Sequence, residues 1–269
     1  MKSIITVAQI KIVPEKGSIE SNCKRLMAVL EKLSKKTIDV VVTPEGFLDG
    51  YVSTQGYVNR KNIMDYAVDP VRSPYVRSIS EWARKNSSWV ILGCIRLSEN
   101  RACNTTIIFN REGNMAGWYD KTHCQAHDRK YLAGNSLHVF NSDFGCFGVM
   151  ICADRRWPEV TRTLALKGAR IIFNPTYGMH NELNLAMMQT RSFESECFII
   201  FTHPAQSLIT GPGGRIITNE EDKKVSVAVT RINLSLVERA RKNPCSHLKN
   251  RRPELYLQDY PAKQLSGNS

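Results

Sequence analysis

Short runs of β-branched and apolar residues alternate along this chain with stretches of helical periodicity. The segment SIITVAQI at residues 3–10 has the composition of a strand and ends at a charged turn. After it, apolar side chains recur at steps of three and four residues, at Ile19, Cys23, Leu26, Leu30 and Leu33. Such spacing places these side chains on one face of a helix. The pattern therefore predicts a strand followed by an amphipathic helix.

The same alternation continues to the C-terminal third of the chain. Further helices are predicted over Tyr75–Lys85, 158–169 and 182–195, and NREGN at 110–114 reads as a hairpin turn. Strands are predicted over 39–45, 89–95, 104–110, 115–121, 147–152, 170–175, 197–204 and 223–232. Strands mixed with helices in this way indicate an α/β fold in which helices cover the sheet faces. In such folds the reactive groups tend to lie where strands end.

The composition favours one globular domain. Of the 269 residues, 42% are hydrophobic and 23% are charged, which suits a well-cored chain. No linker-like or repetitive segment divides it, so we expect a single domain over 1–269 with a short C-terminal extension from about residue 240. No apolar run approaches the roughly 20 residues of a membrane helix, and the N-terminus does not resemble a signal peptide. We expect a cytoplasmic protein without a membrane partner.

Eight cysteines are present, and their closest spacing is the six residues from Cys146 to Cys152. Without a CxxC pair, a zinc or iron–sulfur site has little support. A reducing cytosol would keep the thiols free, and most should be small core residues. We expect no metal and no cofactor.

The net charge of +12 raises the question of a nucleic-acid partner. The densest basic run, ERARKNPCSHLKNRRPE at 238–254, is not accompanied by a helix-turn-helix, zinc-finger or RNP-type motif. A solvated basic surface that attracts anionic small molecules accounts for the charge, and we expect no nucleic-acid partner.

Three predicted strands end at reactive side chains: Glu45, Lys121 and Cys152. Each alone could be a solvated charge or a packed thiol. Together they suit acyl transfer through a thioester. A free thiol, with a pKa of about 8.5, needs a base beside it at neutral pH. Glu45 could take the thiol proton and later activate water, and Lys121 could stabilise the negative oxygen formed on an attacked carbonyl.

These residues lie in segments that resemble the nitrilase superfamily, the carbon-nitrogen hydrolases, whose signature is a Glu-Lys-Cys triad in this chain order. Five segments match in sequence: VVVTPEGFLDGY at 40–51, NTTIIFNREGNMAGWYDKTH at 104–123, GVMICADRRWPEVTRTLALKGARIIFNPT at 148–176, SLITGPGGRII at 207–217 and NRRPELY at 250–256. The resemblance implies a four-layer αββα sandwich and a homodimer or higher homo-oligomer. It also implies Glu45 as general base, Lys121 as oxyanion stabiliser and Cys152 as nucleophile.

The block after Cys152 bears on the substrate. DRRWPE at 154–159 is similar to the N-carbamoyl-D-amino-acid amidohydrolases, in which the two arginines hold the substrate's carboxylate. The resemblance thus implies Arg155 and Arg156 as substrate ligands, and Arg155 is the more informative because an apolar residue is usual there. A guanidinium binds a carboxylate through two hydrogen bonds. The alternative is that Arg155 pairs with a local acid, Glu159 or Asp154.

The segment after Lys121 departs from that subfamily. It is shorter, and the second glutamate that members carry there is replaced. Alignment on Tyr131 puts Asp128 at that position, whereas alignment on Gly134 puts His127 there. If Asp128 fills the role, its carboxylate is one methylene short. His123 matches the family's Lys-x-His step and is predicted either to support the site or to have a purely structural role.

The sequence predicts hydrolysis of an N-carbamoyl or amide group in a small, carboxylate-bearing molecule, with release of ammonia. The alternatives are a simple or ω-amidase, then a nitrilase. True nitrilases typically have Trp-Glu after the cysteine, where this chain has Ala153 and Asp154. An alternative of another class is a degenerate binding module, because a fold does not guarantee activity.

Overall fold

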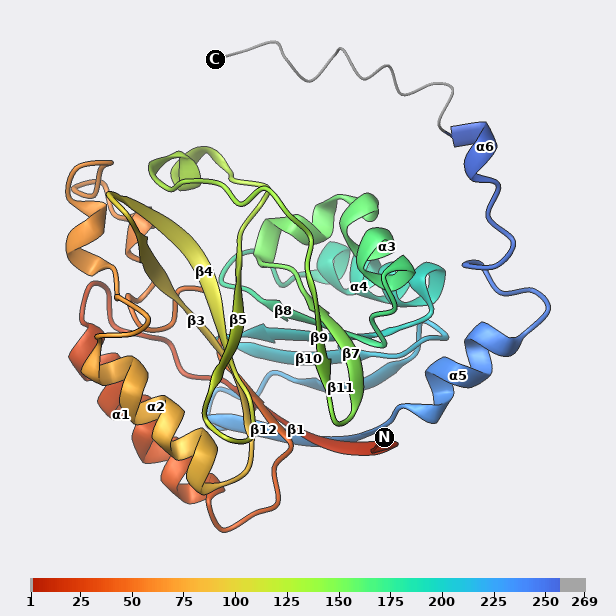
Figure 1. Cartoon of the computed structure of the whole chain (residues 1–269), viewed down its shortest axis with the longest axis horizontal. Coiled ribbons are helices and arrows are strands. Elements are labelled where there is room, and N and C mark those ends of the chain that lie inside the picture. Colours follow the sequence, from red (N-terminus) through yellow and green to blue (C-terminus); the bar gives the residue numbers. More distant parts are fainter. Residues whose placement is uncertain (1, 257–269) are drawn as a thin grey trace.

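Two six-stranded sheets lie face to face between two pairs of helices in the computed structural model, which describes residues 2–256 (Figure 1). The first sheet has the order β12 (Val227–Asn233), β1 (Ile4–Ile10), β2 (Val40–Val42), β3 (Trp89–Ser98), β4 (Arg101–Phe109) and β5 (Met115–Asp120). The second has the order β11 (Ile216–Glu220), β10 (Gln206–Thr210), β9 (Phe198–His203), β8 (Ile171–Pro175), β7 (Gly145–Val149) and β6 (Val139–Ser142). The chain has the four-layer αββα arrangement that the resemblance to the nitrilase superfamily implies.

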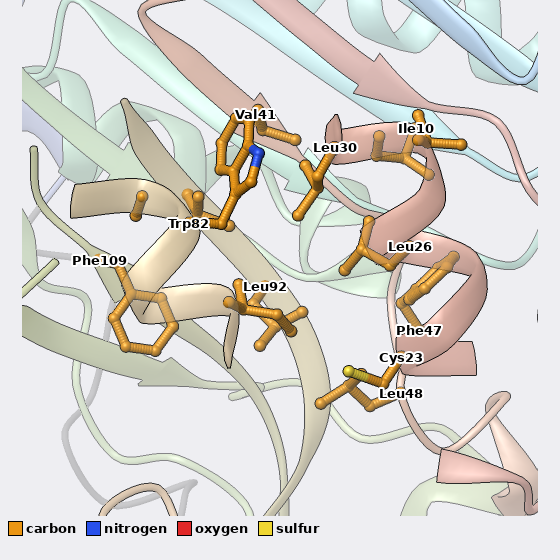
Figure 2. Packing of buried hydrophobic residues seen from close by; sticks show 14 of the residues in the cluster. Ile10, Cys23, Leu26, Leu30, Val41, Phe47, Leu48, Trp82, Leu92 and Phe109 are labelled. Atoms are coloured by element: carbon orange, nitrogen blue, oxygen red, sulfur yellow. The ribbon is translucent and has the colours of Figure 1, made fainter. Parts of the chain in front are cut away.

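One pair of helices, α1 (Ile19–Leu33) and α2 (Pro74–Lys85), covers the outer face of the first sheet. The N-terminus of α2 is capped by Ser73, whose hydroxyl accepts from the Val76 N–H at 3.4 Å, and Pro74 occupies the first turn. Figure 2 shows the apolar layer beneath these helices, which includes Ile10, Cys23, Leu26, Leu30, Val41, Phe47, Leu48, Trp82, Leu92 and Phe109. The apolar stripe that predicts α1 is the face that packs on the sheet.

The second pair, α3 (Pro158–Leu166) and α4 (Glu182–Ser195), packs on the other sheet. Between the two sheets lies an apolar layer that includes Phe147 and Phe173. Strand geometry explains the division of side chains, because successive residues point to opposite faces. In β2, Val40 and Val42 enter the layer between the sheets, whereas Val41 packs beneath α1.

Most predicted elements are present, with some differences at their ends. The helix over 182–195 has the predicted bounds, but the strand expected to reach Cys152 stops at Val149. Cys152 instead begins a 3₁₀ turn, η4 (Cys152–Arg156). Four elements were not predicted from the sequence: the strands β6, β10 and β11 and the helix α5 (Ser235–Lys242).

After α5 the chain leaves the sandwich and runs along its outside to a short helix, α6 (Pro253–Tyr256) (Figure 1). The single domain over 1–269 remains a prediction, since Met1 and 257–269 lie outside the described residues. No helix within residues 2–256 has the length and apolar character needed to cross a membrane. All eight cysteines are free thiols.

Candidate active site

Both sheets contribute to a buried cluster that contains the three predicted catalytic residues. Glu45 comes shortly after β2, Lys121 directly after β5, and Cys152 shortly after β7. The Lys121 Nζ donates to Glu45 Oε1 at 2.8 Å, and both side chains are fully buried. Cys152 is 5% exposed, and its thiol lies within electrostatic reach of both charges. The two sheets therefore bring together the residues that sequence reasoning selected.

Cys152 has an unusual backbone conformation. Its φ of 44° lies in the left-handed region, which non-glycine residues seldom adopt. Asp154 stabilises the turn, because its Oδ2 accepts from the Ile151 N–H at 2.9 Å and from the Tyr119 hydroxyl at 2.8 Å. Backbone strain of this kind persists only where the surroundings impose it, and here it presents the thiol at the end of a buried strand.

The surroundings of Cys152 favour the protonated thiol. Burial raises its pKa and the Glu45 carboxylate raises it further, while Lys121 and Arg155 act in the opposite direction. The pKa is raised overall, so at neutral pH the sulfur carries its proton. Nucleophilic attack by Cys152 thus requires a base, and Glu45 is the carboxylate placed beside it.

Glu45 is held by groups that sequence reasoning missed. Its Oε1 accepts from Asn104 Nδ2 at 2.9 Å, and its Oε2 accepts from the Tyr177 N–H at 3.1 Å. The Tyr177 carbonyl accepts from His203 Nε2 at 2.9 Å, and His203 Nδ1 accepts from the Ala205 N–H at 3.0 Å. Asn104 had a sequence signal, because it is a polar residue at the start of an apolar run. The Tyr177 contact had none, since any residue supplies a backbone N–H.

Lys121 lies between two carboxylates. It donates to Glu45 and, at 2.6 Å, to Asp128 Oδ2. Burial alone would lower the pKa of Lys121, but the Glu45 carboxylate, Cys152 in its thiolate form and the Asp128 carboxylate outweigh it and raise the pKa well above its usual value. Lys121 is therefore an ammonium. Asp128, and not His127, occupies the position beside it that the alignment on Tyr131 predicts.

Arg155 points into the site. Its side chain donates from Nη1 to Cys152 Sγ at 3.4 Å, from Nε to Asn184 Oδ1 at 2.7 Å and from Nη2 to the Met179 carbonyl at 2.7 Å. The residue is 1% exposed, and its guanidinium lies over the ring of Phe201. Among residues 2–256, no carboxylate forms an ion pair with it, so the alternative of pairing with Asp154 or Glu159 has no support.

The two other residues predicted beside the site lie further out. Arg156 is exposed, and its carbonyl accepts from Arg191 Nη2 of α4 at 3.3 Å. This placement does not support a role for Arg156 in binding substrate. His123 Nδ1 lies 3.0 Å from Asp154 Oδ1, and its ring stacks on Trp157. His123 thus supports the turn that carries Cys152 and does not contact the triad.

The sequence model of the family described as "Carbon-nitrogen hydrolase" matches residues 4–242. The chain belongs to the carbon-nitrogen hydrolase family. A protein of Pyrococcus abyssi named "Nitrilase" is 25% identical over 94% of this chain and 100% of its own length. The N-carbamoylputrescine amidase of Arabidopsis thaliana is 23% identical over 88% of this chain and 89% of its own.

This carbon-nitrogen hydrolase also has the fold of solved members of the nitrilase superfamily. Nit3 of Saccharomyces cerevisiae superposes with a TM-score of 0.81 and 21% identity, covering 93% of this chain and 98% of that one. At this identity the likeness shows the fold alone. The chemistry of this family member has to be argued from its own site.

Proposed function

We propose that this carbon-nitrogen hydrolase cleaves an N-carbamoyl or amide group of a small molecule that carries a carboxylate. The observation that carries the proposal is Arg155, a buried guanidinium that contacts the Cys152 thiol and has no carboxylate partner in the described residues. A buried charge is costly unless it is paired, so an anionic substrate group is the partner that this cation lacks. The family match supports amide or nitrile chemistry in general.

In the proposed reaction Cys152 is the nucleophile, Glu45 transfers protons and Lys121 stabilises the oxyanion. Glu45 accepts the thiol proton as the Cys152 sulfur bonds to the carbonyl carbon, and the Lys121 ammonium stabilises the resulting oxyanion. The oxyanion collapses, and ammonia leaves with the proton that Glu45 returns. Water then gives a proton to Glu45 and attacks the thioester, the carbon–sulfur bond breaks, and Glu45 returns this proton to the departing Cys152 sulfur. A carbamoyl substrate yields a carbamate, which loses carbon dioxide and frees the amine.

The role of Arg155 in binding a carboxylate can be tested by substitution, with the adjacent Arg156 as the control. With Arg155→Ala, we expect the KM for carboxylated substrates to rise about 10- to 100-fold, since hydrogen bonds to charged groups contribute about 1.5–3 kcal/mol. The KM for neutral amides of similar size should change little. The matched control is Arg156→Ala, which removes an adjacent but exposed guanidinium. Steady-state ammonia release measures both, and an equal loss on neutral and carboxylated substrates would contradict the proposal.

A substrate panel separates the proposed reaction from the alternatives. N-carbamoyl amino acids, ω-amides of dicarboxylates, simple amides and nitriles are compared by ammonia release, with Cys152→Ala as the background. Preference for carboxylated N-carbamoyl compounds or amides supports the proposal. Activity on neutral amides or nitriles alone would reject it in favour of a simple amidase or a nitrilase, and no activity on any compound would favour the binding module.

A further inference from the structure

The second oxygen of Asp128 faces a pair of side chains outside the triad. While Asp128 Oδ2 accepts from Lys121 and, at 3.1 Å, from the Gln125 N–H, Oδ1 lies 3.4 Å from the Tyr51 hydroxyl. The same hydroxyl lies 2.7 Å from His127 Nε2. Tyr51 thus connects a half-exposed imidazole to the carboxylate that contacts Lys121, and His127 Nε2 itself lies 3.6 Å from Asp128 Oδ1.

The hydrogen bonds in this chain share one direction in the His127 tautomer that carries its proton on Nε2. Asp128 is the ionised partner of an ammonium, so its oxygens only accept. Burial raises the pKa of Tyr51 well above its usual value, and the Glu45 carboxylate raises it further, so the phenol keeps its proton and donates it to Asp128. The phenol oxygen must then accept from His127, which carries a proton on Nε2. The donors therefore run from His127 to Tyr51 to Asp128.

The backbone holds this chain in place. Tyr51 has a φ of 51°, again in the left-handed region, and its N–H donates to the Gly46 carbonyl at 2.8 Å. Two 3₁₀ turns, η1 (Val52–Thr54) and η3 (Ala126–Lys130), are joined because Lys130 Nζ donates to the Ser53 carbonyl at 2.7 Å. A strained tyrosine kept buried between cross-linked turns suggests that the position of its ring matters.

We propose that Tyr51 and His127 are positioning residues for Lys121, acting through Asp128; the proposal rests on the proposed function. An ammonium has three N–H groups. Two of those on Lys121 go to Glu45 and Asp128, which leaves the third for the oxyanion. The aspartate has one methylene fewer than the glutamate expected there, and its outer oxygen is fixed by the tyrosine–histidine pair. Without the tyrosine–histidine pair, the Asp128 carboxylate can rotate, and the third N–H of Lys121 is no longer held towards the oxyanion.

The other charges near Tyr51 do not contact its hydroxyl. The Lys16 Nζ lies 5.7 Å and the Lys121 Nζ 5.9 Å from the centre of the Tyr51 ring, and Lys16 donates to the Tyr51 carbonyl at 3.2 Å. Neither can replace the hydroxyl at Asp128 Oδ1. Because the hydroxyl and the imidazole both face Asp128 Oδ1, removal of either should loosen the same carboxylate oxygen.

The test is a double-mutant cycle on the full chain. Tyr51→Phe and His127→Leu should each lower kcat about fivefold with KM within about twofold, for carboxylated and neutral amides alike, since loss of a hydrogen bond costs about 1 kcal/mol. The double variant should lose no more than the worse single one. His127→Gln, whose amide can donate from the same place, should restore most of the activity. Tyr57→Phe, at an exposed position of the same loop, is the control.

Three results would overturn the proposal: an unchanged kcat in Tyr51→Phe, losses that multiply in the double variant, or a His127→Gln variant as slow as His127→Leu. If the wild-type chain releases no ammonia from any compound, the proposed function fails, and the positioning is then measured by alkylation of Cys152 with iodoacetamide. Lys121 lowers the pKa of this thiol. Alkylation at pH 8 should therefore slow several-fold in Tyr51→Phe and His127→Leu but not in His127→Gln, and unchanged rates would overturn the proposal.

Discussion

His203, which lies outside the triad, makes the stability of the fold depend on pH. Burial lowers its pKa to about 4, and the neighbouring His180 and Arg155 act in the same direction. The unfolded chain binds this proton with a pKa of about 6.5. Because the folded-state pKa is the lower one, the stabilising contribution is complete above pH 6.5 and is lost as pH falls towards 4.

We therefore expect acid to weaken the fold in this window, with a His203 contribution of up to about 3 kcal/mol. The variant His203→Gln can still donate to the Tyr177 carbonyl but does not titrate. Urea unfolding at pH 7 and pH 4.5 should show a smaller fall in the free energy of unfolding for the variant than for the wild type. Equal falls would mean that another group is responsible.

Some residues of the site could be identified from the sequence, and others could not. Glu45, Lys121 and Cys152 could be selected because each ends a run of residues with the apolar pattern of a strand. Arg155 could be singled out over Arg156 as the more informative arginine, but the burial of one and the exposure of the other follow from the 3₁₀ turn that replaces the end of the predicted strand. Asn104 contacts Glu45 from a different strand, a relation that no local pattern encodes.

Among the elements, β3 carries the turn that holds Glu45. A Cβ on Gly93 would lie 2.2 Å from the Pro44 carbonyl oxygen and 3.2 Å from the Glu45 Cα. Thr43 and Leu48 are also bound to the Gly93 backbone, so the whole turn rests on this position. Only glycine permits so close an approach of two backbone segments.

Gly93→Ala should displace Glu45 and lower kcat about 100-fold, since small misplacements of catalytic groups cost about this much. Overpacking should also destabilise the fold by about 1–3 kcal/mol. Ammonia release and thermal unfolding measure the two effects. Gly56→Ala is the control, because a Cβ there meets no atom within 4 Å. A Gly93→Ala enzyme with wild-type kcat would show that Glu45 does not depend on this contact.

The elements that the sequence predicted are those with strong apolar patterns. The stripe of α1 and the valines of β2 are buried and were easily read. The strand β11 is largely exposed and follows the glycine-rich turn at 211–214, so its sequence carries little strand signal. Pairing with β10 makes it a strand, and such a pairing is a tertiary property.

For the whole molecule, the face formed by α3, α4 and the C-terminal segment is incompletely covered. A cavity of about 740 Å³ lies there, lined by residues that include Glu159, Phe193, His247, Arg251 and Tyr256. Phe193 is 49% and Tyr256 48% exposed. Large exposed apolar side chains grouped at a cavity are typical of an interaction surface. We propose that a second copy of the chain covers this face and that the expected homodimer forms through it.

The proposed dimer would also support the active site. Asn184, on α4, binds the Arg155 side chain, and Arg191 Nε of the same helix donates to the Arg155 carbonyl at 3.2 Å. Phe193→Glu should therefore yield a monomer in light scattering coupled to size exclusion, with a raised KM for carboxylated substrates. Val71→Glu, an exposed apolar position just before α2 on the opposite outer layer, should leave the dimer intact. A glutamate buried in the interface without a partner would cost several kcal/mol, which is why the Phe193→Glu variant should not dimerise. A Phe193→Glu protein with the same mass as the wild type would therefore place the interface elsewhere.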